Sequence, residues 1–536
     1  MNQNKRNRNL FLNIPSDGIE EQIIKDYEAS ADEYRENIRK YLKVYLDNTS
    51  VGTVIFNVFY RRSVVDSDYV DSMYYNIKLD ENLCPVLDSN GKTIKTVSPD
   101  TDNKFLKGYR YAIKRGIDII AMAITEARKY GVNVLVSVRM DDHHDINDPG
   151  LNSSFSYDNF ERTSIDGDGE RLDYCKEEVR NYYGRFILEL CHKYDIDGIE
   201  FDYLRTCPIM SCVNDETTNT LTEYMRSLKE EAEKIANKKI RFTARIYPDE
   251  KTNLNYGIDA VRWITEGIVD TIAPEGWYIP TYYGIDASAW KKIIDQKNVN
   301  SYPYTVIPGT DWAVRCDSTD YSGYIMWITI EQFRGFVSSM YQKDADGIYI
   351  FNHFYLDSDP GSHTYYIDEN GNKTCENVIH EKMIVAGSQE LAEKGMRVYV
   401  NTCPEYRNNL YPISVTKDKS YTFAINTGTK PKNGYFKVVV GVDSKTDENN
   451  IIKVLVNGIP ATQLQDILPE PGFEWKVNDF FEPVASHISE TCPRVMQFSI
   501  DDISCINTGE NIVTVEALDN EQHIKWLEVH VEDIQK

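Results

Sequence analysis

The feature that most constrains the fold is the regular alternation of short apolar runs with amphipathic helical stretches through the first 395 residues. The helical stretches repeat apolar residues three and four positions apart, which is the period of a helix with one buried face. Parallel strands joined by right-handed helical crossovers follow from such alternation, and eight units predict an α/β fold of the closed (β/α)8 TIM barrel type. The eight predicted strands are Asn9–Pro15, Thr53–Tyr60, Val134–Met140, Ile196–Tyr203, Ile240–Tyr247, Val269–Glu275, Tyr302–Ile307 and Gly347–Asn352.

An open doubly wound sheet is the rival of the barrel. No G-x-G-x-x-G motif follows a predicted strand and no P-loop is present, so the dinucleotide-binding version of that rival lacks its fingerprint. Within the barrel, the pattern predicts one helical segment over Ile19–Asp47, a hairpin turn at Ser89-Asn90-Gly91 and a last helix at Gln389–Lys394.

The helical period ends near residue 396, which divides the chain into a barrel over residues 1–395 and a second domain over residues 396–536. In the second part short β-rich runs alternate with turn residues, which predicts an all-β sandwich. Trp526 lies in an alternating strand and is predicted to be a core residue. The predicted strands are Tyr421–Ile425, Phe436–Val442, Lys453–Val456, Met496–Ile500, Ile512–Glu516 and Trp526–Val531.

The net charge limits which kinds of molecule the protein can bind. The 59 basic and 84 acidic residues give a net charge of −25, which disfavours nucleic acid and anionic membrane surfaces. No apolar run is long enough to span a bilayer. The basic N-terminus is not followed by an apolar signal region and the ten cysteines are scattered, so we expect a cytoplasmic protein with reduced thiols, or a secreted one if a leader has been removed. No cofactor is predicted, and the oligomeric state is left open.

The fourth predicted strand carries two acidic side chains on its inner face. Side chains alternate across a strand, and the apolar Ile199 and Phe201 must face the helices. Glu200 and Asp202 therefore point into the barrel near its C-terminal end, where the active sites of such barrels lie. The same alternation turns Arg139, Asp141, Arg245 and Tyr247 inward from the two adjacent strands. The alternative is that the carboxylates only form ion pairs with these arginines.

The sixth strand ends in Glu275, followed by Gly276, Trp277 and Tyr278. Val269 and Ile272 have opposite parity, so alternation does not settle which face Glu275 takes. A carboxyl group beside aromatic rings at a barrel mouth acquires a raised pKa by desolvation, which suits a general acid. A solvated loop residue is the other interpretation.

Two carboxylates from different strands together with aromatic platforms form the constellation that cleaves glycosidic bonds. One carboxyl group protonates the leaving oxygen, and the other attacks the anomeric carbon or activates water. We expect an oligo- or polysaccharide substrate, which is anionic if the inward arginines are not neutralised by their acidic neighbours. The remaining candidate substrate-binding residues are Asn57, His353 (otherwise a core histidine) and the platform residues Tyr203, Trp277, Tyr278, Trp312 and Tyr355.

Three segments resemble the glycosyl-hydrolase-like family 10 barrels. They are YDIDGIEFDYLR (194–205), GIDAVRWITEGIVDTIAPEGWY (257–278) and AITEARKYGVNVLVSVRM (123–140), and their order and spacing agree with that family over roughly residues 50–360. The resemblance implies a (β/α)8 glycoside hydrolase in which Asp202 matches the motif aspartate. The chain departs from the pattern at Glu200, where histidine is common, and at Glu275, where an amide or a small residue is common.

The resemblance also suggests roles, because many related retaining glycosidases carry the nucleophile on strand four and the acid/base on strand six. It implies that Asp202 is the nucleophile and Glu275 the acid/base. Glu200 would then orient the substrate or hold Arg139 or Arg245. Exchanged roles of Glu200 and Asp202 are the alternative, and either a retaining or an inverting outcome is open.

Two other functions compete with glycoside hydrolysis. The run Asp141–Asp145, which contains two histidines, offers metal ligands for a metal-dependent hydrolase or deacetylase, although neighbouring residues of a strand point in opposite directions. The run Asp166–Glu170 resembles half a calcium loop and is predicted as a turn. The chain could also be a non-catalytic carbohydrate-binding protein, and the C-terminal domain, with Trp475, an accessory or carbohydrate-binding module.

Overall fold

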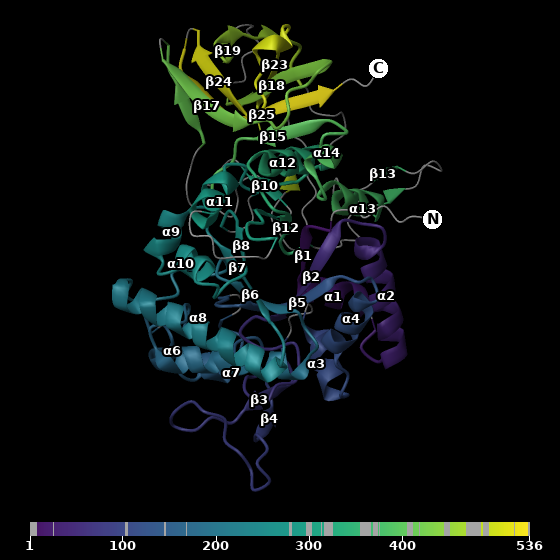
Figure 1. Ribbon diagram of the computed structural model, residues 1–536, viewed down its shortest axis with the longest axis vertical. Helices are drawn as coiled ribbons and strands as arrows, with labels where there is room; N and C mark the ends of the chain where they lie inside the picture. The colour runs from purple at the N-terminus through teal and green to yellow at the C-terminus, as the bar shows by residue number, and fades with distance from the viewer. Residues whose placement is uncertain are drawn as a thin grey trace.

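The computed structural model describes residues 8–24, 26–101, 106–143, 146–167, 169–277, 281–295, 303–311, 313–315, 325–353, 366–367, 373–374, 376–404, 411–417, 419–443, 451–467, 484–485, 492–518 and 520–533. Figure 1 shows a central group of strands surrounded by helices, with a hairpin projecting at one end and antiparallel sheets at the other. Among the described residues, no helix combines the length and the apolar character that crossing a membrane requires.

Eight parallel strands form the central sheet in the order β8-β7-β6-β5-β2-β1-β12-β9. A further parallel bridge joins Ile272 of β8 to Val306, which precedes β9, so the two ends of the sheet meet. This pairing confirms the predicted TIM barrel. The strands are β1 (Leu10–Ile14), β2 (Val51–Phe59), β5 (Asn133–Arg139), β6 (Gly198–Asp202), β7 (Arg241–Ile246), β8 (Thr271–Pro274), β9 (Gly309–Thr310) and β12 (Ile348–Ile350).

The helices of the barrel cover the outside of this sheet (Figure 1). The single helical segment predicted over Ile19–Asp47 is wrong, because Ser30 caps a new helix with a reciprocal hydrogen-bonded pair to Glu33. The prediction also missed α13. The helices are α1 (Ser16–Ile23), α2 (Ala31–Leu46), α3 (Lys107–Lys114), α4 (Ile119–Arg128), α5 (Ser154–Tyr157), α6 (Phe160–Thr163), α7 (Glu177–Lys193), α8 (Asp215–Ala236), α9 (Glu250–Asn255), α10 (Ala260–Thr265), α11 (Ala287–Asp295), α12 (Ile330–Gln342), α13 (Glu376–Val385) and α14 (Gln389–Ala392).

The barrel strands are buried on both faces, and alternation separates the two faces. The outer apolar set packs against the helices, whereas a smaller cluster fills the inside. Packed layers of inward side chains are typical of TIM barrels. The inner apolar cluster consists of Phe11, Ile55, Leu135, Ala273, Ile307, Tyr349 and Phe351, with Tyr304 packed against it.

Short strands outside the barrel complete this part of the chain. β3 (Tyr75–Ile77) and β4 (Lys95–Val97) pair as an antiparallel hairpin around the predicted turn, in which Gly91 has a positive φ of 77°. β10 (Ala313–Arg315), β11 (Ile325–Trp327) and β22 (Val484–Ala485) form a small sheet, and β13 (Tyr366–Ile367) pairs with β14 (Lys373–Thr374). Because β22 comes from the C-terminal part of the chain, its parallel pairing with β11 links that part to the barrel region.

Two antiparallel sheets follow the barrel, as an additional β-rich domain. One has the order β15-β25-β18-β23-β21 with β16 on β25, and the other has the order β17-β24-β19-β20. Trp526 is 2% exposed, which confirms it as a core residue; Trp475 lies outside the described residues. The division at residues 395 and 396 and the sandwich arrangement stay predictions. The strands are β15 (Arg397–Val400), β16 (Ile413–Val415), β17 (Ser420–Asn426), β18 (Gly434–Val442), β19 (Ile452–Val456), β20 (Ile459–Pro460), β21 (Thr462–Gln463), β23 (Arg494–Ser499), β24 (Glu510–Ala517) and β25 (Gln522–Asp533), with a 3-10 helix at Ile503–Cys505.

Candidate active site

The two carboxylates of β6 occupy successive inner layers of the barrel. Glu200 lies in register with Ser137 of β5 and Thr243 of β7. Asp202 lies one layer nearer the C-terminal mouth, in register with Arg139 and Arg245. The apolar Ile199 and Phe201 belong to the outer cluster. The inward orientation of Glu200, Asp202, Arg139 and Arg245 therefore agrees with the alternation of their strands.

Arg245 joins two carboxylates that come from different strands. Its Nη1 donates to Asp202 Oδ1 at 2.9 Å, and its Nε donates to Glu275 Oε2 at 2.7 Å. The guanidinium lies over the ring of Phe351, 3.4 Å from the ring centroid. Glu275 is 0% exposed, so the interpretation of Glu275 as a solvated loop residue is wrong. The tertiary contacts of Glu275 show that it faces the inside of the barrel, which the mixed parity of the strand left open.

Each of these two carboxylates keeps one oxygen that is not used in binding the protein. Asp202 Oδ1 also accepts a hydrogen bond from the Leu204 amide at 3.0 Å. Asp202 Oδ2 and Glu275 Oε1 accept no hydrogen bond from any residue in the described part of the chain. Buried carboxylate oxygens are normally satisfied, and two that are not, on either side of one guanidinium, point to a site for another molecule.

Burial and neighbouring charges shift the pKa values of Glu275 and Arg245. Burial raises the pKa of Glu275, Arg245 opposes this shift, and the charge on Asp202 adds to it. Burial disfavours the charged form of Arg245, but the charges on Glu275 and Asp202 outweigh that effect and raise its pKa well above the usual value. Arg245 is therefore a permanent cation, and its lowering effect on the pKa of Glu275 is outweighed by the burial of that carboxyl group.

Glu200 lies deeper and has different partners. Its Oε1 accepts a hydrogen bond from Asn13 Nδ2 of β1 at 2.8 Å. Burial and the charge on Asp202 raise the pKa of Glu200 to about 7, against the opposing effects of the Ser137 and Tyr349 hydroxyls. The expectation that Glu200 holds Arg139 or Arg245 is wrong, because Asn13 takes the place of an arginine in this deeper layer.

Arg139 pairs with Asp142 and not with the carboxylates of β6. Its Nη1 donates to Asp142 Oδ2 at 2.6 Å, and its Nη2 donates to Asn352 Oδ1 at 3.3 Å. Arg205 Nε lies 3.7 Å from the same Asp142 oxygen. The guanidinium of Arg139 also covers the ring of Tyr60, 4.2 Å from its centroid. Arg139 thus lines the mouth as part of an ion-pair network.

Asp141 is bound by two groups of the protein. Its two oxygens accept hydrogen bonds from Arg61 Nη2 and from the Leu172 amide, each at 3.1 Å. Burial raises its pKa to about 6. Asp141 Oδ2 thereby holds the loop at Leu172 in place, and a substrate contact of Asp141 stays a prediction.

The arginines of this region are paired with acidic side chains, so the expectation of an anionic sugar loses its basis. Each described arginine at or near the mouth has an acidic partner within 4.0 Å. The arginines are Arg61, Arg139, Arg205 and Arg245, and the acidic partners are Asp141, Asp142, Asp202 and Glu275.

The metal-site alternative finds no support in the described residues. They contain no group of three or more His, Cys, Asp or Glu side chains arranged to hold an ion. Asp141 and Asp142 face arginines, and His143 Nδ1 lies 2.8 Å from Thr206 Oγ1; His144 and Asp145 lie outside the described residues. In the half calcium loop, Asp166 pairs with Arg171, and Asp168 is also outside them.

The aromatic candidates separate into distinct environments. Tyr203 is wrong as a platform residue, because the alternation that turns Asp202 inward turns Tyr203 outward, against Trp263 and Met225. Tyr247 stacks on Tyr256 with ring centroids 4.9 Å apart. Trp277 is 7% exposed, and its amide donates to the Pro404 carbonyl at 2.8 Å. Substrate contacts of Tyr247 and Trp277 stay predictions; Trp312, Tyr278 and Tyr355 lie outside the described residues.

His353 and Asn57 also differ in position. The His353 ring makes an edge-on contact with Tyr45 of α2 at 5.5 Å, and burial lowers its pKa to about 3. The His353 side chain is half-buried, and its contact with a sugar stays a prediction. Asn57 is fully buried beside Ser137 in the sheet register and accepts a hydrogen bond from the Phe59 amide at 3.2 Å. Its role toward a substrate stays a prediction.

Sequence reasoning missed several residues that shape the site. Asn13 and Phe351 have the inward parity of their strands, and that parity was a usable signal. Gly309 has no such signal: a Cβ at this position would lie 2.7 Å from Glu275 Cδ. Only the closed barrel shows that β9 passes this closely to Glu275.

Comparisons with known proteins complete the description. No protein-family model matches the sequence, and no curated protein matches it. Among solved structures, a cycloisomaltooligosaccharide glucanotransferase from Paenibacillus sp. is 10% identical, with a TM-score of 0.33, over 98% of this chain and 58% of its own. The α-L-fucosidase isoenzyme 2 from Paenibacillus thiaminolyticus is 12% identical, with a TM-score of 0.38, over 70% of this chain and 49% of its own.

The β-glucosidase of Pyrococcus furiosus is 11% identical, with a TM-score of 0.37, over 73% of this chain and 98% of its own. The chain thus spans 58% and 49% of the first two enzymes. At these scores the assignment of the barrel rests on its own strand pairing. The more specific resemblance to the glycosyl-hydrolase-like family 10 barrels stays a prediction.

Proposed function

We propose that this protein is a glycoside hydrolase that cleaves a glycosidic bond at the C-terminal mouth of its barrel. The observation that carries the proposal is the bridge from Arg245 to Asp202 and Glu275. It brings carboxylates of two strands to one point and leaves each with a free oxygen. Glycosidases use such a pair of carboxyl groups.

The two carboxylates have environments that suit different roles. Asp202 Oδ1 accepts hydrogen bonds from Arg245 and from the Leu204 amide, which hold the carboxylate in place and leave Oδ2 for the bond to the anomeric carbon. Burial raises the pKa of Glu275, which favours a protonated acid. In the proposed reaction Asp202 Oδ2 attacks the anomeric carbon, and Glu275 Oε1 gives its proton to the leaving oxygen. Water deprotonated by Glu275 then releases the sugar from Asp202.

This assignment makes the reaction retaining. Retaining enzymes hold their two carboxyl groups about 5–5.5 Å apart, whereas inverting enzymes leave room for a water molecule between them. Proton NMR of the first-formed product checks the outcome: the anomeric configuration of the substrate is kept.

Entry of a sugar requires movement at the mouth. Glu200, Asp202 and Glu275 are each 0% exposed, and Arg245 is 1% exposed. A substrate must therefore displace the groups that cover the carboxylates. Removal of water strengthens the electrostatic interactions of the site.

The first prediction concerns the two carboxylates. Hydrolysis is measured with a panel of chromogenic glycosides and with neutral polysaccharides. We expect Glu275→Gln to lower kcat by about 10²–10⁴-fold, the usual contribution of a general acid, and Asp202→Asn to lower it by at least as much. Both variants keep a side chain of the same size, so the barrel should still fold.

Asp270→Asn is the matched control. Asp270 lies at the opposite end of β8, where its carboxylate accepts hydrogen bonds from Lys229 and from the Phe242 amide. Its loss changes stability but not the chemistry of the mouth. Wild-type turnover in Asp202→Asn or Glu275→Gln would remove that residue from the mechanism. Binding of sugars without turnover by the wild-type chain would instead support a carbohydrate-binding protein.

A further inference from the structure

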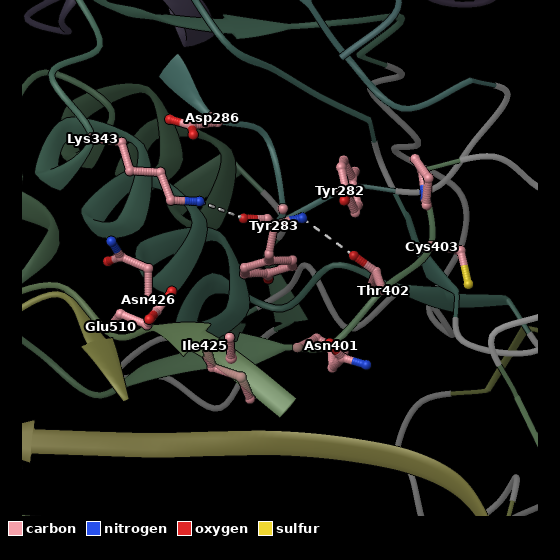
Figure 2. Close-up of a pocket in the computed structure, with 14 residues that line it drawn as sticks. Tyr282, Tyr283, Asp286, Lys343, Asn401, Thr402, Cys403, Ile425, Asn426 and Glu510 are labelled. Atoms are coloured by element: carbon pink, nitrogen blue, oxygen red, sulfur yellow. Dashed lines mark hydrogen bonds between the residues drawn. The ribbon is translucent and has the colours of Figure 1, made fainter. Parts of the chain in front are cut away.

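A second polar pocket lies between the barrel helices and the C-terminal sheets (Figure 2). Its volume is about 610 Å³, within the range of small-molecule sites. The segment before α11 and the end of α12 form one wall, and the segment after β15 together with β17 and β24 forms the other. Its lining includes none of the mouth residues Glu200, Asp202, Arg245 and Glu275.

The wall of this pocket is held in place from both sides. Lys343 Nζ donates to the carbonyls of Tyr283 and Ile285 at 3.1 and 2.9 Å. The Tyr283 amide donates to Thr402 Oγ1 at 3.2 Å, across the boundary with the C-terminal part (Figure 2). The Tyr283 hydroxyl donates to the Gln332 carbonyl at 2.8 Å. The pocket is thus preformed, which lowers the entropic cost of binding a ligand.

The lining combines an aromatic ring with amides and carboxylates. Tyr282 is half-buried and folds back over Gly284, where a Cβ would overlap the ring. Asn426 and Glu510 lie opposite each other in the β17–β24 ladder, and Glu510 is exposed. Asp286 on the barrel side is exposed as well. Figure 2 shows Lys343 and Asp286 on one side and Asn426 and Glu510 on the other.

This chemistry selects the class of ligand. Two carboxylates and one ammonium line the pocket, so the net charge of the lining disfavours an anion. Carboxylates and amides accept and donate hydrogen bonds to hydroxyl groups, and a tyrosine face packs against an apolar face of a ring. We propose that this pocket is a second carbohydrate site, which binds a short neutral oligosaccharide without cleaving it.

The test uses the full chain with Asp202→Asn, so that probes are not consumed. Cellotetraose, maltotetraose, tetra-N-acetylchitotetraose and the anionic tetragalacturonate are titrated by calorimetry. We expect one or more of the neutral probes to bind and tetragalacturonate not to bind. Adding Tyr282→Ala to this variant should lower the affinity for the neutral probe by about tenfold, and adding Glu510→Gln should lower it by about threefold.

Glu516→Gln is the matched control, since it lies on the same strand β24 and pairs with Lys453 outside the pocket; affinity should not change. Glu510 is exposed, so its variant folds even if Tyr282→Ala does not. Absence of binding by all three neutral probes overturns the proposal. Equal affinity in the parent, Tyr282→Ala and Glu510→Gln overturns it as well.

The pocket and the mouth can fail separately. If the wild-type chain cleaves a glycoside, but Tyr282→Ala does not change the affinity for the probes, the results support the hydrolase and exclude the second site. Tyr282-dependent binding by a chain that cleaves none of the tested glycosides would support the second site and contradict the proposed hydrolysis.

Discussion

At the scale of the residue, Arg245 organises the mouth. Buried ion pairs gain little net stability, because desolvation offsets the attraction, but loss of one partner leaves an uncompensated buried charge. Arg245 is 1% exposed and bonds to both Asp202 and Glu275. Its value therefore lies in holding two carboxyl groups from different strands next to each other.

Glu200 gives a pH-dependent prediction for stability. Burial and the charge on Asp202 raise its pKa from 4.5 to about 7. Between these values the folded protein keeps a proton that the unfolded chain has lost, so the free energy of unfolding falls as the pH rises from about 4.5 to about 7. A pKa difference of this size corresponds to roughly 3 kcal/mol. The free energy of unfolding is measured with urea at pH 5 and pH 8. Between these values it should fall less in Glu200→Gln than in the wild-type protein.

The amide of Glu200→Gln can still accept the hydrogen bond from Asn13 Nδ2, so the variant isolates the titration. Glu516, which is half-buried and pairs with Lys453, serves as a control, and Glu516→Gln should keep the wild-type pH dependence. If the free energy of unfolding falls equally in Glu200→Gln and in the wild-type protein between the two pH values, Glu200 is already ionised in the folded protein at pH 5.

At the scale of the element, the barrel depends on one very short strand. β9 spans only Gly309–Thr310, although the bridge between Val306 and Ile272 extends the contact that closes the sheet. Gly309 lies in register with Tyr349 and directly against the Glu275 side chain. A short strand without a side chain at this point leaves room for Glu275 to turn inward.

Gly309→Ala is therefore expected to impair turnover more than stability. The new Cβ would lie 2.7 Å from Glu275 Cδ, and the carboxylate must move away from Arg245. We expect kcat to fall by about 10-fold or more, with a modest decrease in Tm. Gly198→Ala provides the contrast, because its Cβ would overlap the backbone carbonyl of Arg241. That variant should lose stability first, and equal Tm losses in both variants would contradict this role of Gly309.

At the scale of the whole molecule, the barrel and the C-terminal sheets are joined by close packing. Helix α12 contacts β15 at Gly335, where a Cβ would lie 2.6 Å from the carbonyl carbon of Val398. Tyr399 Oη donates to Ser338 Oγ on the same helix at 3.1 Å. The pairing of β22 with β11 adds a second connection. The junction is therefore part of the folded core.

Gly335→Ala should weaken this junction. Forcing a methyl group into a closely packed contact costs about 1–3 kcal/mol, and the expected result is a lower Tm by differential scanning calorimetry. Gly184→Ala in α7 is the matched control, because its Cβ would meet Leu228 Cδ2 at an ordinary 3.4 Å, and alanine favours a helix. An unchanged Tm in Gly335→Ala would show that the helix can shift away from β15 without cost.

Much of this fold was predictable because it depends on local periodicity. The apolar parity of Ile199 and Phe201 turns Glu200 and Asp202 inward, and the repeated strand–helix pattern predicts the barrel. The same alternation turns Tyr203 away from the inside of the barrel. The prediction that Tyr203 is a sugar platform did not apply this rule, and it is wrong. The break between α1 and α2 was missed because Ser30 and Glu33 form a cap within a continuous apolar pattern.

The amino-acid sequence by itself determined which side chains enter the barrel, because alternation is a property of the extended backbone. The tertiary structure alone decided which of them meet. Arg139 pairs with Asp142, Arg245 bridges Asp202 and Glu275, and Glu200 lies in a deeper layer with Asn13. These partners come from strands far apart in the chain, and their distances depend on how the sheet is tilted and closed.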